Sequence, residues 1–103
     1  MKTMFLGDVV GRSGRDVVVE NVPILRERLS LDFVVVNGEN AAGGFGITAE
    51  ICKAFYDAGV DIVTGGNHSW HQQQVIGYID GDTRLLRPLN IAPDAPGRGA
   101  QTY

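Results

Sequence analysis

The sequence has 103 residues, of which 44% are hydrophobic and 20% are charged, so it suits one globular domain rather than two. A formal net charge of −3 argues against a basic nucleic-acid-binding module and against a polybasic membrane anchor. No apolar run approaches the roughly 20 residues of a membrane span, and the single cysteine, Cys52, excludes an internal disulfide and a cysteine metal cage. We therefore expect a cytoplasmic protein without stable nucleic-acid or membrane binding.

The first part of the chain predicts a strand, a glycine-rich loop and a helix. Lys2–Leu6 is the strand and Gly7–Gly14 the loop, in which Ser13 is a candidate N-cap. Apolar residues at i, i+4, i+7 and i+11 then predict one face of a helix: Val18, Val22, Leu25 and Leu29. Pro23 lies inside this helix and lacks a backbone donor, so it predicts a kink unless packing compensates.

The same pattern follows a second time. Phe33–Val36 is a continuous β-branched run, typical of a strand buried on both faces of a parallel sheet. A second glycine-rich loop, Gly38–Gly46, comes next. Thr48 is placed to cap a helix, and Gly59 fits its C-terminal end. The helix itself is predicted by apolar residues at i, i+3, i+4 and i+7: Ile51, Ala54, Phe55 and Ala58.

A third unit and an irregular tail complete the chain. Asp61–Thr64 predicts a strand, Gly65–Trp70 a loop, and His71–Ile79 a weaker helix because it contains a glycine. Arg84–Arg87 predicts a short fourth strand, inside a tail over 84–103 that is rich in proline and glycine. Alternating strands and helices indicate an α/β fold with a parallel sheet and right-handed crossovers.

Polar side chains flanked by glycine follow each of the first three predicted strands. They are Asp8 after the first, Glu39 and Asn40 after the second, and Asn67 and His68 after the third. In an open parallel sheet these strand ends meet at one edge, where ligands bind. Each residue alone has an ordinary explanation as a turn or capping residue, but their conjunction indicates a site. Carboxylate and amide oxygens suit Mg, Mn or Ca, and imidazole extends the choice to Fe or Zn.

Several segments resemble the successive motifs of a known enzyme superfamily. They are Gly7–Gly11, Gly14–Asp16, Asn37–Ala42, Gly66–Trp70, Arg87–Asn90 and Pro96–Gly99. In order and spacing they resemble the calcineurin-like metallophosphoesterases, and most of all the bacterial 2′,3′-cyclic-nucleotide 2′-phosphodiesterases. The resemblance implies a layered sandwich with a mostly parallel sheet flanked by helices. Residues 1–103 would form its N-terminal βαβαβα portion, a single and partial domain.

The resemblance also implies an activity and a role for each matching residue. The function would be metal-dependent hydrolysis of 2′,3′-cyclic nucleotides or related small phosphodiesters, by a metal-activated hydroxide that attacks phosphorus. The cofactors would be two divalent metal ions, iron or manganese, with magnesium and zinc as alternatives. Asp8 would bind the first metal, Glu39 would bridge both, Asn40 and Asn67 would bind the second, and His68 would protonate the leaving ribose oxygen.

Two departures from the family leave other readings open. His71 stands where the family usually has an acidic residue, which predicts weaker support for the His68 loop. Family members are also more than twice this length, and their second half supplies further metal-binding histidines, so we expect an incomplete dinuclear site. The alternative is a truncated, non-catalytic binding or interaction module, as a homo-oligomer that covers its open sheet edge. A flavodoxin-like or phosphoacceptor domain would leave the loop around Glu39 without a role.

Overall fold

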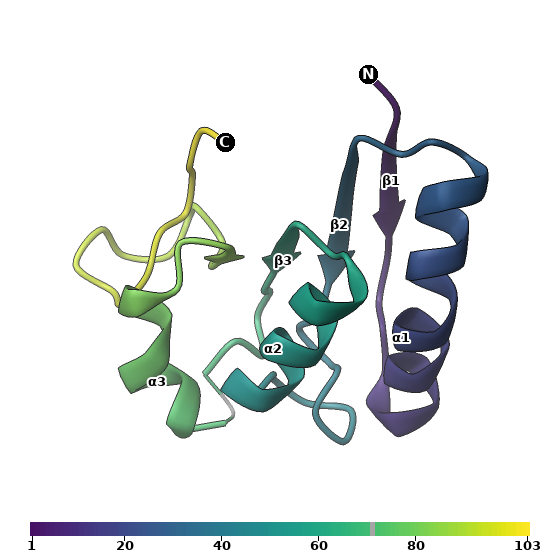
Figure 1. Cartoon of the computed structure of the whole chain (residues 1–103). Helices are drawn as coiled ribbons and strands as arrows, with labels where there is room; N and C mark the ends of the chain where they lie inside the picture. The colour runs from purple at the N-terminus through teal and green to yellow at the C-terminus, as the bar shows by residue number, and fades with distance from the viewer. Residues whose placement is uncertain (71) are drawn as a thin grey trace.

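The computed structural model describes residues 1–70 and 72–103. In this part of the chain, four strands form one parallel sheet in the order β1-β2-β3-β4, and helices connect the first strands in turn (Figure 1). The strands are β1 (Thr3–Leu6), β2 (Phe33–Asn37), β3 (Ile62–Thr64) and β4 (Leu85–Leu86). The helices are α1 (Gly11–Arg28), α2 (Ala49–Ala58), α3 (Gln74–Tyr78) and a 3-10 turn η1 (Ile79–Gly81). The predicted α/β class with a parallel sheet is confirmed.

The helices cover one face of the sheet. Helix α1 packs on α2, and α2 packs on α3. The core beneath them takes the side chains of alternate strand positions, including Val34 and Val36 of β2, both fully buried. The other positions of β2 are only half-buried. The prediction that this strand is buried on both faces is therefore wrong. Strands added in sequence by right-handed crossovers place every helix on the same side, and among the described residues no helix covers the opposite face.

Helix α1 begins before the residue predicted to cap it. Its N-cap is Val10, which is extended and makes no side-chain cap, so Ser13 lies inside the helix and the predicted cap is wrong. The Gly11 amide instead donates to the Asn40 carbonyl at 3.1 Å, across from the next loop. The helix then continues through Pro23, which is exposed, as far as Arg28. A contact distant in sequence therefore sets where this helix starts.

Helix α2 follows its sequence signals closely. The Thr48 hydroxyl accepts a hydrogen bond from the Ile51 amide at 3.3 Å, as predicted for an N-cap. Gly59 ends the helix in a left-handed conformation with φ of 106°, where a side chain would be strained. Cys52 and Phe55 are fully buried beneath the helix. The caps set the bounds of α2, and its two buried side chains join the core that β2 and β3 also line.

The third predicted helix is shorter than expected. Helix α3 spans Gln74–Tyr78 and is continued by η1, whereas the prediction began at His71. His71 lies outside the described residues. After β4 the chain makes turns and one isolated bridge between Leu86 and Arg98, which agrees with the irregular tail expected from its prolines and glycines.

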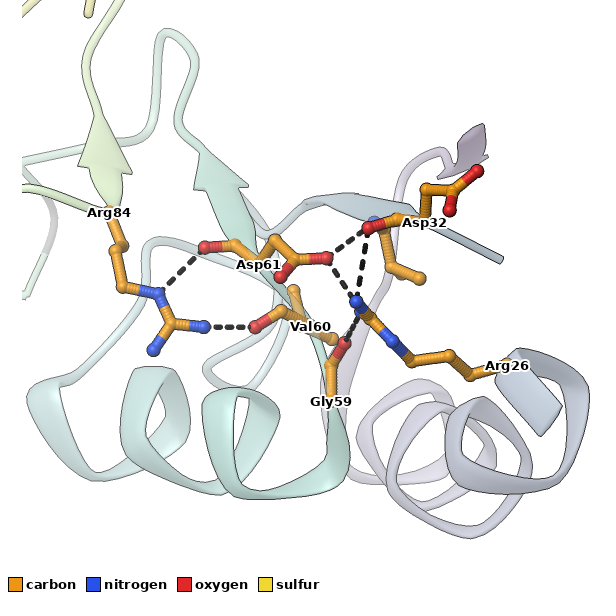
Figure 2. Close-up of polar contacts among 7 residues, drawn as sticks. Arg26, Asp32, Gly59, Val60, Asp61 and Arg84 are labelled. Atoms are coloured by element: carbon orange, nitrogen blue, oxygen red, sulfur yellow. Dashed lines mark hydrogen bonds and ion pairs between the residues drawn. The ribbon is translucent and has the colours of Figure 1, made fainter. Parts of the chain in front are cut away.

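A cluster of polar contacts fixes the end of the sheet where the strands begin (Figure 2). The guanidinium Nη1 of Arg26, from the end of α1, donates to the Asp61 carboxylate and to the Gly59 carbonyl, both at 2.6 Å. Asp61 Oδ2 also accepts from the Val34 amide at 2.8 Å. On the other side, Arg84 Nε donates to the Asp61 carbonyl at 2.8 Å. These contacts join α1, β2, β3 and β4, and they leave the opposite end of the sheet to the predicted site.

Candidate functional site

The candidate site lies at the carboxyl ends of β1, β2 and β3. Because the strands are parallel and in register, the loops that follow them meet at one edge of the sheet. The Val9 amide donates to the Asn37 carbonyl at 3.2 Å, which ties the loop after β1 to the end of β2. The Gly38 amide donates to the Thr64 carbonyl at 2.9 Å, which ties the loop after β2 to the end of β3. Backbone contacts thus hold the three loops together.

Asn40 links two of the other predicted site residues. Its Nδ2 donates to Asp8 Oδ1 at 2.9 Å, and its Oδ1 lies 2.7 Å from His68 Nδ1. An amide oxygen can only accept, so the hydrogen of this second contact belongs to His68 Nδ1. The imidazole is therefore oriented by Asn40.

Glu39 presents a buried carboxylate oxygen to the same place. Its Oε2 lies 3.9 Å from His68 Nδ1 and has no hydrogen-bond partner among the described residues. Leaving a buried charged oxygen unpaired is costly. Gly66 makes this position possible, since a Cβ there would lie 1.9 Å from Oε2. A cation would supply the partner that this oxygen lacks.

Asp8 adopts an unusual backbone conformation for a residue with a side chain. Its φ is 46°, in the left-handed region. Such conformations cost of order 1 kcal/mol or more and persist only where the surroundings impose them, often at functional sites. Here the amide of Val9 is bonded to the end of β2 and that of Gly11 to the loop after it, which leaves Asp8 to turn toward Asn40.

Asn67 is the predicted site residue that the structure does not bring into contact with the others. It is exposed on the loop after β3, and its side chain makes no hydrogen bond within the described ranges. No group of three or more His, Cys, Asp or Glu side chains forms a metal-binding cluster in the described part of the chain. The set brought together is thus two carboxylates, one amide and one imidazole. These donors fit a divalent cation but do not surround one.

Two residues at this edge carry roles that the sequence did not reveal. Ser69 is 5% exposed, and its hydroxyl accepts from the Gly66 amide at 2.8 Å and donates to the Gly66 carbonyl at 2.6 Å. It shapes the loop that carries His68, and its spacing of three residues from Gly66 was the available signal. Phe45 lies with its ring centroid 5.2 Å from that of His68. Its position between two glycines was the only sequence signal.

A groove runs beside the site along the open edge of the sheet. Strand β1 is an edge strand, and a cavity of about 500 Å³ lies between it and α1. The lining is mostly apolar, with Phe5, Val10 and Val17 all largely exposed, and the cavity reaches Asp8. Within the described residues, the loops after β2 and β3 lie on one side of the site and the groove lies on the β1 side.

The strongest pKa shifts lie away from this edge, under α2. Burial, followed by the charge of Asp82, raises the pKa of the Cys52 thiol to about 12. Burial also raises the pKa of Tyr56 and of Tyr78, and both hydroxyls donate to the Asp82 carboxylate, at 2.8 and 2.5 Å. This hydrogen-bonded cluster joins α2 to α3 and the turn before β4, so we interpret it as structural.

Among the described residues, no helix is long and apolar enough to cross a membrane.

The chain is similar in sequence and in structure to several known proteins. It is 42% identical over 99 residues to a 2′,3′-cyclic-nucleotide 2′-phosphodiesterase of Bacillus subtilis, a match that covers 96% of this chain and 38% of that protein. A crystal structure of a hypothetical protein from Thermus thermophilus superposes with a TM-score of 0.88 at 38% identity, covering 96% of this chain and 38% of the other.

A crystal structure of a phosphatase from Mycoplasma pneumoniae superposes with a TM-score of 0.87 at 34% identity, and covers 96% of this chain and 37% of that one. The chain thus spans less than two fifths of the length of these relatives. The family model described as YmdB-like protein matches residues 4–103. The resemblance seen in the motifs is confirmed at the level of the whole chain, which belongs to the YmdB-like family.

Proposed function

We propose that this chain forms part of a metal-dependent phosphodiesterase that hydrolyses 2′,3′-cyclic nucleotides or related small phosphodiesters. The observation that carries the proposal is the buried Glu39 oxygen without a partner, held next to His68 and to the Asp8–Asn40 pair. A divalent cation is the ligand that such an oxygen favours. The relatives are named as phosphodiesterases and phosphatases, which supports the same reaction class.

The residues would divide between two metal ions, for which iron or manganese is our first choice and magnesium or zinc the alternative. Asp8 would hold the first ion, Glu39 would bridge both, and Asn40 and Asn67 would hold the second. When bound, the metals would supply Lewis-acid stabilisation of the charge on the phosphoryl oxygens. Asn67 would have to turn inward from its exposed position to take part.

His68 would hold the proton for the leaving oxygen. Because its Nδ1 donates to Asn40 Oδ1, the proton to be transferred would sit on Nε2. Asn40 therefore serves in this proposal both as a ligand and as the group that orients the imidazole. Removing its amide should misalign His68 as well as weaken the metal site.

The charge of the site supports the view that it is incomplete. Two carboxylates balance only half of the charge of two divalent ions, so further ligands are needed. The groove along β1 leaves space for these further ligands beside Asp8.

We place the protein in the cytoplasm, where small phosphodiesters are available as substrates.

The test is metal uptake and turnover by the purified 103-residue chain. We expect binding of Mn²⁺ or Fe²⁺ and metal-dependent hydrolysis of bis-p-nitrophenyl phosphate and of 2′,3′-cyclic AMP. Glu39→Gln, which keeps the size but removes the charge, should lower metal affinity by at least about tenfold. Glu50→Gln, on the exposed start of α2, is the matched control and should behave as wild type. Absence of metal uptake by the wild-type chain would refute metal binding by these residues alone and reduce the chain to a fragment of the site.

The open edge of β1 favours a second candidate function. In the sheet of the described residues, β1 is an edge strand next to an apolar groove, and such an edge is a docking surface for another strand. In this case the chain would be a non-catalytic interaction module that associates as a dimer. Light scattering separates the two candidates, because a monomer that binds metal contradicts the second, and a dimer that takes up none contradicts the first.

A further inference from the structure

Two arginine side chains in the chain after β4 have buried donors without acceptors. Arg87, which follows the last residue of β4, is 8% exposed, and its Nε has no hydrogen-bond partner among the described residues. Nη1 of Arg98 is likewise buried and unpartnered within the same part of the chain. Both residues belong to segments, Arg87–Asn90 and Pro96–Gly99, that have no role in the proposed function. Their buried donors therefore need a separate explanation.

The backbone holds these two segments together. Leu86 and Arg98 form an isolated parallel bridge, and the Arg87 amide donates to the Arg98 carbonyl at 2.9 Å. A Cβ at Gly99 would lie 2.7 Å from the Leu89 Cα and 3.2 Å from Arg87 Nη1, so only a glycine lets the second segment pass this close. The guanidinium of Arg87 is therefore enclosed by the segment that carries Arg98.

Within the described residues, no carboxylate forms an ion pair with either arginine. The Asp80 carboxylate reaches the same segment, but its Oδ1 accepts from the Gly97 amide at 2.7 Å. The carboxylate of Asp82 accepts from the hydroxyls of two tyrosines and from the Arg84 amide. The two segments thus bring together two positive charges without a counter-ion from the described part of the chain.

One edge of the Arg87 guanidinium lacks an acceptor. The only hydrogen bond of this side chain within the described residues joins Nη1 to the Pro88 carbonyl at 3.0 Å. Nε and Nη2 remain, and these two donors form an edge of the planar fork that binds two oxygens of one phosphate or carboxylate. Because a buried charge without a partner is costly, the missing partner is an oxyanion.

The position of the arginines favours a phosphoryl group among the oxyanions. The Gly65 amide donates to the Leu86 carbonyl at 2.7 Å, which joins the loop after β3 to the end of β4. Arg87 thus follows β4 at the same edge of the sheet as the candidate site, one strand further along. At pH 7 a phosphate monoester carries a charge of about −1.5 to −2, close to what two arginines neutralise, whereas a carboxylate carries a single charge.

We propose that Arg87 and Arg98 form a binding site for phosphate or a phosphate monoester at the carboxyl end of β4, separate from the ligands of the proposed metal site. Arg87 supplies the contact through the Nε edge of its guanidinium, and Arg98 adds the second positive charge. Hydrolysis of a cyclic phosphodiester leaves a phosphate monoester, so the product of the proposed reaction is a ligand of this class. The inference rests on the proposed function only for the choice of a phosphoryl group, since binding by the arginines needs no metal.

The experiment measures binding of inorganic phosphate by calorimetry, without metal and in a chloride buffer, together with urea unfolding of the same chain. The wild-type chain should bind phosphate and be more stable in its presence. Arg87→Met, which keeps an unbranched side chain of similar volume, should weaken phosphate binding by about 10- to 150-fold, the range for loss of a hydrogen bond to a charged group. Its unfolding midpoint in phosphate-free buffer should not fall, because the variant removes a buried charge that has no partner.

Further variants separate this site from the other charges of the chain. Arg98→Gln should weaken phosphate binding by about two- to fivefold, since it removes a charge but not the contact. Arg28→Gln is the matched control, because it removes the same charge from an exposed arginine at the end of α1, and it should change nothing. Glu39→Gln should also leave phosphate binding unchanged. Acetate, titrated under the same conditions, should bind more weakly than phosphate.

The inference is overturned by a wild-type chain that binds no phosphate, by acetate binding as tight as that of phosphate, or by a loss in Arg28→Gln or Glu39→Gln equal to that in Arg87→Met. An Arg87→Met chain that does not fold also overturns it, because the arginine then serves the fold. Uptake of Mn²⁺ is measured in the same preparations. If Mn²⁺ binds and phosphate does not, the inference fails and the proposed function stands. If phosphate binds through Arg87 and Mn²⁺ does not bind, the inference stands without the metal site.

Discussion

Substitution of Gly66 by alanine should disrupt the candidate site through a single methyl group. A Cβ at Gly66 would lie 1.9 Å from Glu39 Oε2 and 2.3 Å from its carboxyl carbon. Contacts of a real Cβ stay beyond 3.0 Å, so the carboxylate must retreat by about 1 Å or more. The backbone at Gly66 is not left-handed, and the cost is therefore one of contact rather than of backbone strain. We expect a loss of about 1–3 kcal/mol in the free energy of unfolding, the usual cost of overpacking.

The same displacement should lower the affinity for Mn²⁺, by at least about tenfold, because Glu39 is the proposed bridging ligand. Urea unfolding followed by circular dichroism measures the first effect, and isothermal titration with Mn²⁺ measures the second. Gly77→Ala is the matched control, since a Cβ at this helical glycine would meet no atom of the described residues within 4 Å. It should be neutral or stabilise by up to about 1 kcal/mol. A Gly66→Ala chain that unfolds and binds Mn²⁺ like wild type would refute the close packing on which the reasoning depends.

Two further predictions concern stability away from the site. Arg26→Ala removes the donor to Asp61, Gly59 and Asp32. Because the ion pair with Asp61 is about one third exposed, we expect the free energy of unfolding in urea to fall by about 2 kcal/mol. A change no larger than that of the exposed control Arg12→Ala would contradict the role given to the cluster. The second concerns alkaline pH, where the Cys52 thiol, with its pKa raised to about 12 by burial, stays protonated in the folded chain after the unfolded chain has begun to ionise. The contribution of this thiol to the free energy of unfolding is fully present below about pH 9 and should decrease toward pH 12, by at most about 1.4 kcal/mol per pH unit. Urea unfolding at pH 7, 9 and 10.5 should show this decrease. The variant Cys52→Ala should show a smaller decrease.

The sequence predicts most of the scaffold because the signals are local. The cap at Thr48, the end of α2 at Gly59 and the parallel strands all follow from residue type and spacing. The start of α1 could not be predicted in the same way, since the Asn40 carbonyl that accepts from Gly11 lies 29 residues away. Nor does an apolar run such as Phe33–Val36 tell whether one or both of its faces will be covered.

For the candidate site, the sequence predicts which residues reach the same edge but not how they interact. Parallel strand order is enough to bring Asp8, Asn40 and His68 together. The structure adds that Asn40 lies between the other two, an arrangement that depends on side-chain rotamers and on the left-handed turn at Asp8. Asn67 lies on the expected loop but is exposed, because its side-chain direction depends on the local backbone rather than on the motif.

The order of the strands also bears on how the protein is made. Each strand pairs with the strand synthesised immediately before it, β2 with β1, β3 with β2 and β4 with β3. None of the four described strands has to insert between two that are already paired, so each loop closure among them spans only one strand–helix unit. Such a sheet can grow in one direction as the nascent chain leaves the ribosome. The glycine-flanked loops would then come together in the order of translation, and the loop bearing His68 would be the last to arrive.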